Sequence, residues 1–86
     1  MELKDYRDQL DTIDAQLLAL FQERMTIVQQ VADYKKTHEI PILASGREQE
    51  ILERVRQNSR KELAPYAQTL FETLLSVSRA YQETLL

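Results

Sequence analysis

The chain has 86 residues, of which 43% are hydrophobic and 29% charged, with a net charge of −3, one histidine and no cysteine. This length allows one domain, and the composition excludes a disulfide framework and a zinc site built from cysteine and histidine. The negative charge argues against general nucleic-acid binding, and the longest apolar run, residues 17–21, is too short to cross a membrane. We therefore expect a soluble, cytoplasmic protein that binds neither nucleic acid nor membrane and has no metal site.

The first predicted element is a long helix over about residues 5–38, with Asp5 as its N-cap and Pro41 beyond its end. Its inward stripe alternates spacings of four and three and consists of Tyr6, Leu10, Ile13, Leu17, Leu20, Arg24, Ile27, Val31 and Tyr34. Such a helix is roughly 50 Å long, whereas a compact chain of this size is about 30 Å wide. We expect it to protrude and to be covered by a second copy in an intertwined homodimer.

Two shorter helices follow the loop that contains Pro41. Ser45 and Glu48 match the capping-box pattern, so the second helix is predicted over about residues 46–58. Pro65 suits the first turn of a third helix over about residues 64–85. The inward stripe of the third helix consists of Ala67, Leu70, Phe71, Leu74, Val77, Ser78, Tyr81 and Leu85. No strand pattern or repeat occurs, so residues 1–86 are predicted to form a single all-α domain of three helices.

Several polar residues fall on these inward faces. Lys35 follows Arg24 by eleven residues and therefore lies within about 20° of it around the helix axis, so both side chains point to the same face. Glu48 precedes the apolar face of the second helix by one turn, and Gln82 continues the line of Ser78 in the third.

Each of these residues also has a structural explanation. Arg24 can extend along a groove or pair with Glu48, and Lys35 can interact with the helix dipole. Glu48 can close its capping box, Ser78 can bond to the carbonyl four residues earlier, and Gln82 can lie on the surface.

Taken together, the inward residues favour a ligand, because two cations face one carboxylate and an unpaired buried cation is costly. We predict an internal pocket for an anion, in which Ser78 and Gln82 are neutral donors and Glu48 accepts a hydrogen bond from a hydroxyl. The sequence has no cysteine nucleophile, no serine nucleophile context for its lone histidine and no glycine-rich phosphate loop. Covalent catalysis and metal chemistry are therefore not expected.

The residues Ile13-Asp14-x-x-Leu17-Leu18-x-Leu20-x-x-Glu23-Arg24, followed by Tyr34-Lys35-Lys36, Pro41 and Arg47-Glu48, resemble the all-helical class of chorismate mutases. The similarity runs from about residue 3 to residue 85, and the spacing of these segments to Ser78 and Gln82 adds to its specificity. The resemblance implies an isomerase of phenylalanine and tyrosine biosynthesis that converts chorismate to prephenate without a cofactor. It also implies a homodimer with two shared active sites.

The resemblance further implies a role for each matching residue. Arg24 and Arg7 would hold the substrate carboxylates, Lys35 would contact a carboxylate and the ether oxygen, and Gln82 would donate to that oxygen. Glu48 would bind the ring hydroxyl. Ser78 would help to bind a substrate carboxylate, and Arg47 would lie at the pocket edge.

Arg7 lies about 25 Å from Arg24 along one helix, which is too far for one small substrate to bridge. It can contribute only to the pocket of the other subunit. Lys35 lies about 16 Å from Arg24, a separation that two long side chains can close around a ligand. Ala44 stands where the family usually has an aspartate. Its backbone N–H, which the family also uses, is kept and can still bind the ring hydroxyl, whereas the missing side-chain contact would change the affinity for the substrate and the orientation of Arg47.

Two other functions fit the same residues. An isochorismate pyruvate lyase of the same fold would grip two carboxylates in much the same way, and a non-catalytic helical dimer would serve in regulation or docking. The second alternative would be favoured by loss of Arg7, Arg24 or Lys35, all of which are present. The sequence is compatible with a self-contained enzyme, a mutase domain of a larger enzyme and an artificial sequence of this type.

Overall fold

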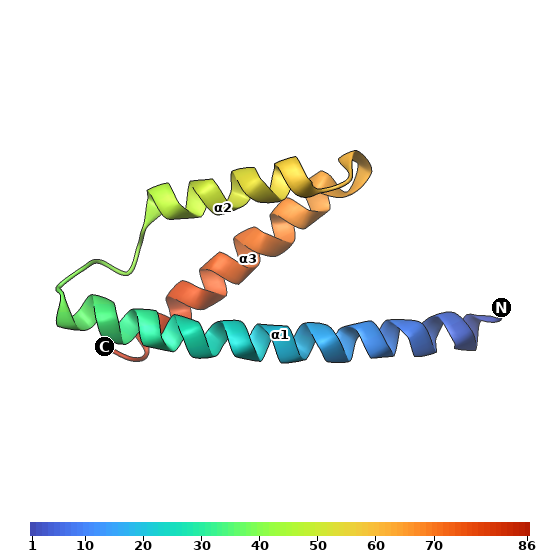
Figure 1. Ribbon diagram of the computed structural model, residues 1–86, viewed down its shortest axis with the longest axis horizontal. Helices are drawn as coiled ribbons and strands as arrows, with labels where there is room; N and C mark the ends of the chain where they lie inside the picture. The colour runs from blue at the N-terminus through green and yellow to red at the C-terminus, as the bar shows by residue number, and fades with distance from the viewer.

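The computed structural model describes residues 1–86 and consists of helices joined by short connections (Figure 1). Its elements are α1 (Leu3–Thr37), α2 (Ser45–Asn58), the 3-10 helix η1 (Lys61–Leu63) and α3 (Ala64–Glu83). The chain contains no strand, which confirms the all-α prediction. None of the helices combines the length and apolar character that a transmembrane segment needs.

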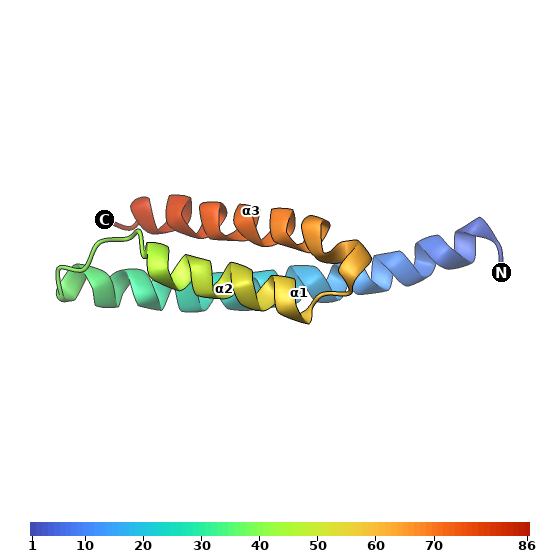
Figure 2. The same ribbon diagram turned by 90° about the horizontal axis from the view of Figure 1, so that it is seen from above.

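The length of α1 determines the shape of the molecule. The chain extends 54 Å along its longest axis and has a radius of gyration of 16.0 Å, well above the ~12 Å of a compact chain of this length. Figures 1 and 2 show that the N-terminal half of α1 continues beyond α2 and α3. The first helix therefore protrudes, as its predicted length required.

The helix ends differ from the sequence prediction in two caps. The N-cap of α1 is Glu2, and the predicted cap Asp5 lies inside the first turn, where its Oδ2 accepts a hydrogen bond of 2.8 Å from the Glu2 N–H. The N-cap of α2 is Ala44, and the capping box expected from Ser45 and Glu48 does not form. Helix α2 begins one residue too early for that box, because Ser45 is already helical.

The short helix η1 before α3 was not predicted, whereas Pro65 lies in the first turn of α3 as expected. Helix α3 ends at Glu83, short of the predicted residue 85.

Helix α3 packs against both α1 and α2. The residues buried in the chain belong to α1 and α3 and are Val28, Ala32, Leu75, Ser78 and Gln82. The predicted stripe of α1 is divided: Arg24, Ile27 and Val31 line a pocket, whereas its N-terminal members are not covered within one chain. Of these, Leu10, Leu17 and Leu20 are 57%, 55% and 61% exposed, because α3 covers only the C-terminal half of α1.

Candidate functional site

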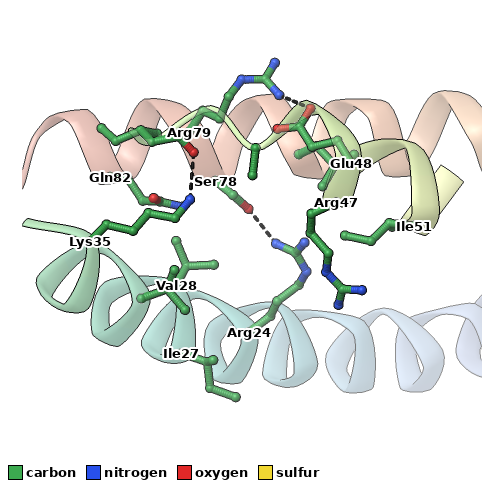
Figure 3. A pocket seen from close by; sticks show the side chains of 14 residues that line it. Arg24, Ile27, Val28, Lys35, Arg47, Glu48, Ile51, Ser78, Arg79 and Gln82 are labelled. Atoms are coloured by element: carbon green, nitrogen blue, oxygen red, sulfur yellow. Dashed lines mark hydrogen bonds and ion pairs between the residues drawn. The ribbon is translucent and has the colours of Figure 1, made fainter. Parts of the chain in front are cut away.

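A pocket of about 280 Å³ lies where the C-terminal half of α1, the start of α2 and the C-terminal half of α3 come together (Figure 3). It combines an apolar wall with several charged groups. Its lining residues are Arg24, Ile27, Val28, Val31, Lys35, Ile42, Ala44, Arg47, Glu48, Ile51, Leu75, Ser78, Arg79 and Gln82. All the residues predicted for the site line this pocket except Arg7.

Arg24 enters the pocket from α1 and meets α3. Its guanidinium donates a hydrogen bond of 2.5 Å to the Ser78 hydroxyl, which itself donates to the Leu74 carbonyl at 2.7 Å. Ser78 thus makes the backbone bond that a structural role predicted and also fixes the arginine. Because its only proton is used by Leu74, Ser78 acts here as an acceptor for Arg24, and the predicted role as a donor to a ligand requires that proton to turn.

Lys35 lies in the last turn of α1, and the loop that follows holds its side chain. Its Nζ donates a hydrogen bond of 2.8 Å to the Ile42 carbonyl. An ammonium has three donors, so this bond leaves two for another partner. In Figure 3 the side chains of Lys35 and Gln82 lie toward the same end of the pocket.

Gln82 is only 7% exposed, and its side chain makes no hydrogen bond within the chain. Its Oε1 is fully buried without a partner. Buried side-chain amides are nearly always paired, so an unpaired amide in a pocket wall is a group that a ligand or water would satisfy. The prediction that Gln82 faces inward is therefore met, and its surface alternative is not.

Glu48 projects from the first turn of α2 toward α3. One of its carboxylate oxygens accepts a short hydrogen bond from the Arg79 guanidinium, and the two side chains form an ion pair (Figure 3). Glu48 therefore neither caps α2 nor pairs with Arg24, the two structural roles considered from the sequence. Arg79 was not predicted as a site residue, and its only signal in the sequence is its position one turn after Leu75 on the buried side of α3.

Arg47 and Ala44 complete the α2 side of the pocket. The Arg47 guanidinium is 3.4 Å from Glu50 on the same helix, and its side chain is 57% exposed, which places it at the pocket edge. Ala44 contributes no polar side chain, but its carbonyl accepts from the Glu48 N–H at 2.9 Å and its own N–H remains unpaired.

Arg7 is not part of this pocket. It is exposed on the protruding half of α1, where it forms no ion pair within the chain. Nothing in a single chain brings it to Arg24.

The charges of the pocket do not cancel. Arg79 neutralises Glu48, the only carboxylate in the lining, whereas Arg24 and Lys35 have no carboxylate partner. Two uncompensated cations on a partly apolar wall favour a ligand with more than one negative group.

Comparison with known proteins identifies the family. The family described as chorismate mutase type II matches residues 6–83. The chain belongs to this family. It is 39% identical over 59 residues to a protein named T-protein from Haemophilus influenzae, and that match covers 69% of this chain and 16% of the relative. It is 35% identical over 54 residues to a bifunctional chorismate mutase/prephenate dehydratase from Aquifex aeolicus, covering 63% of this chain and 15% of the relative.

The matched part therefore spans about one sixth of the length of these curated relatives. No solved structure gives a significant match. The family is the one that the sequence motifs around Arg24, Lys35 and Glu48 resemble.

Proposed function

We propose that the chain catalyses the rearrangement of chorismate to prephenate. The observation that carries this proposal is the pair of cations, Arg24 and Lys35, that face one pocket without carboxylate partners in a chain of the chorismate mutase type II family. Chorismate is a dianion with a ring hydroxyl and an ether oxygen, so each polar group of the pocket has a chemical counterpart in the substrate.

The reaction is an intramolecular rearrangement in which a C–O bond breaks while a C–C bond forms. It needs no base, nucleophile or cofactor. The pocket has to hold the enolpyruvyl arm over the ring and place donors where negative charge grows on the ether oxygen. Lys35 and Gln82 are the groups proposed for that oxygen. Lys35 can keep its bond to the Ile42 carbonyl and still donate to the substrate, and the Gln82 amide has no competing partner in the chain.

The remaining groups are proposed to bind and orient the substrate. Arg24, held by Ser78, would bind one carboxylate, and Arg47 would turn from Glu50 at the pocket edge toward the substrate. Glu48 would accept a hydrogen bond from the ring hydroxyl. The unpaired N–H of Ala44 is a second candidate partner for that hydroxyl.

We further propose that two chains share two such sites in an intertwined homodimer. Two features support this arrangement: the exposed apolar stripe of α1, and the distance of about 25 Å along the helix between Arg7 and Arg24. A twofold partner would cover the stripe and bring its own Arg7 to the open end of the pocket.

The decisive experiment follows the disappearance of chorismate and identifies the product. We expect prephenate, and Arg24→Ala should lower kcat/KM by one to two orders of magnitude, the range for losing a charged hydrogen bond. Arg60→Ala is a matched control, because Arg60 is 75% exposed and pairs only with Glu62 at 3.6 Å. Pyruvate released from isochorismate would instead identify the lyase reaction, and no turnover of either substrate would contradict both enzymatic assignments.

A further inference from the structure

The ion pair between Glu48 and Arg79 joins α2 to α3 at the wall of the pocket (Figure 3). The two side chains are 21% and 33% exposed, so the pair is partly shielded from water. Arg79 and Glu48 also line a second, smaller cavity, together with Leu52, Glu72 and Leu75. In Figure 3 the Arg79 guanidinium lies on the side of the Glu48 carboxylate away from Arg24 and Lys35.

The geometry of the pair leaves part of the carboxylate available. Arg79 bonds to Oε1 of Glu48, whereas Oε2 makes no hydrogen bond in the chain. An ionised carboxylate has lone pairs on both oxygens and accepts hydrogen bonds only. One oxygen is thus anchored, and the other can accept a bond from a hydroxyl in the pocket.

The ion pair between Glu48 and Arg79 also affects how Glu48 interacts with the other cations of the pocket. Glu48 is the only carboxylate in the pocket lining, and three other cations, Arg24, Lys35 and Arg47, line the same pocket. A carboxylate without Arg79 would be attracted to those cations, which are the groups proposed to bind the substrate. The ion pair with Arg79 holds Glu48 away from these cations, so that Glu48 does not compete with the substrate for them.

We propose that Arg79 is a positioning residue for Glu48: it fixes one oxygen of the carboxylate so that the other accepts the ring hydroxyl of chorismate. This inference rests on the proposed function. Ala44 makes it more important here, because this chain lacks the carboxylate at position 44 and depends on Glu48 alone for an acidic contact.

The test compares wild type, Arg79→Met, Arg79→Lys, Glu48→Gln and the double variant Arg79→Met/Glu48→Gln. Each is assayed for kcat and KM with chorismate and for its melting temperature. Arg79→Met should lower kcat/KM roughly tenfold, as for one charge-assisted hydrogen bond, mainly through KM, because the hydroxyl contact exists both before and during the reaction. Arg79→Lys keeps a cation near Glu48 and should recover most of the loss.

The double variant separates positioning from general damage. If Arg79 acts through Glu48, then Arg79→Met should change kcat/KM by no more than about twofold when Glu48 is already glutamine. The same loss in both backgrounds would overturn the proposal. Arg60→Met is the control for loss of an arginine from an exposed ion pair and should leave the kinetics unchanged.

A substrate analogue with hydrogen in place of the ring hydroxyl gives an independent readout. Wild type and Arg79→Met should bind this analogue equally well, because the contact that Arg79 supports is absent from it. If Arg79→Met does not fold, the same comparison is made with Arg79→Gln, which also lacks the cation, and equally weaker binding of chorismate and of the analogue would overturn the inference. Absence of prephenate formation by wild type would instead contradict the proposed function, so the two failures are distinguishable.

Discussion

The two halves of α1 carry the same apolar spacing but differ in what covers them. In the C-terminal half, Val28 and Ala32 are buried where α1 packs against α3, and Arg24 and Lys35 project into the pocket. In the N-terminal half no other element covers the helix, and Leu17 is 55% exposed. Helical periodicity therefore identifies a face that can be buried, whereas the neighbouring elements decide whether one chain buries it. We expect the C-terminal half to carry the pocket and the N-terminal half to contact a second chain.

The largest effect is expected in the C-terminal half, from Lys35→Ala. This change removes a donor proposed for the ether oxygen, and losing such a donor typically costs about 10²-fold or more in rate. The steady-state kcat/KM for chorismate measures the loss. Lys36→Ala is the matched control, because Lys36 is the next residue of the same helix and is exposed. A rate close to wild type for Lys35→Ala would remove this residue from the mechanism.

Arg7→Ala probes the N-terminal half in the same assay. If Arg7 binds a substrate carboxylate in the partner's pocket, its loss should lower kcat/KM by about ten- to a hundredfold, the range for one charge-assisted hydrogen bond.

Mixing two variants of low activity tests whether the site is shared. Dimers that combine Arg7→Ala with Arg24→Ala carry one site with both arginines intact and one site with neither. Random exchange of equal amounts should restore about a quarter of the wild-type activity per chain. No recovery, despite exchange shown by a tagged chain, would place both arginines in the same subunit's site or Arg7 in none.

The Leu17→Ala variant tests whether a second chain covers the exposed apolar stripe of α1 in solution. For a residue that remains on the surface the free energy of unfolding should change by less than about 0.5 kcal/mol, whereas truncation of a buried leucine costs about 2–5 kcal/mol. We expect Leu17→Ala to lower the free energy of unfolding by about 2 kcal/mol or more. We also expect the melting temperature of the wild type to rise with protein concentration, because dimerisation stabilises the folded chain. Gln16→Ala, at the neighbouring exposed position, is the control. Light scattering that shows a monomer at micromolar concentration would contradict the dimer.

Local signals were sufficient for the helices and for most of the pocket. The spacing of four and three residues predicts α1, and the inward polar residues Arg24, Lys35 and Gln82 do line one cavity. Their alignment could be predicted because each side chain follows the periodicity of its own helix, which depends only on nearby residues.

Contacts between helices could not be predicted in the same way. Glu48 and Arg79 are 31 residues apart, and their pairing depends on how α2 packs against α3. The caps at Glu2 and Ala44 lie three residues and one residue before the predicted caps Asp5 and Ser45, because the helix continues through residues that could also have capped it. The apolar spacing continues along the whole of α1 and does not indicate where the cover from α3 ends, so the exposure of Leu10, Leu17 and Leu20 within one chain could not be predicted from it.

The smallest effect is expected from Ala44→Asp at the junction between α1 and α2. Ala44 is the N-cap of α2 and makes no side-chain capping bond, so an aspartate there should raise the free energy of unfolding by about 1 kcal/mol. Ala44→Asn supplies a similar cap without the charge. If the position also serves the ring hydroxyl, the aspartate variant should lower KM for chorismate by a few-fold, and the asparagine variant by less, because a carboxylate is a stronger acceptor than an amide oxygen. Equal gains in melting temperature with unchanged KM in both variants would restrict position 44 to capping and leave Glu48 as the acidic partner of the hydroxyl.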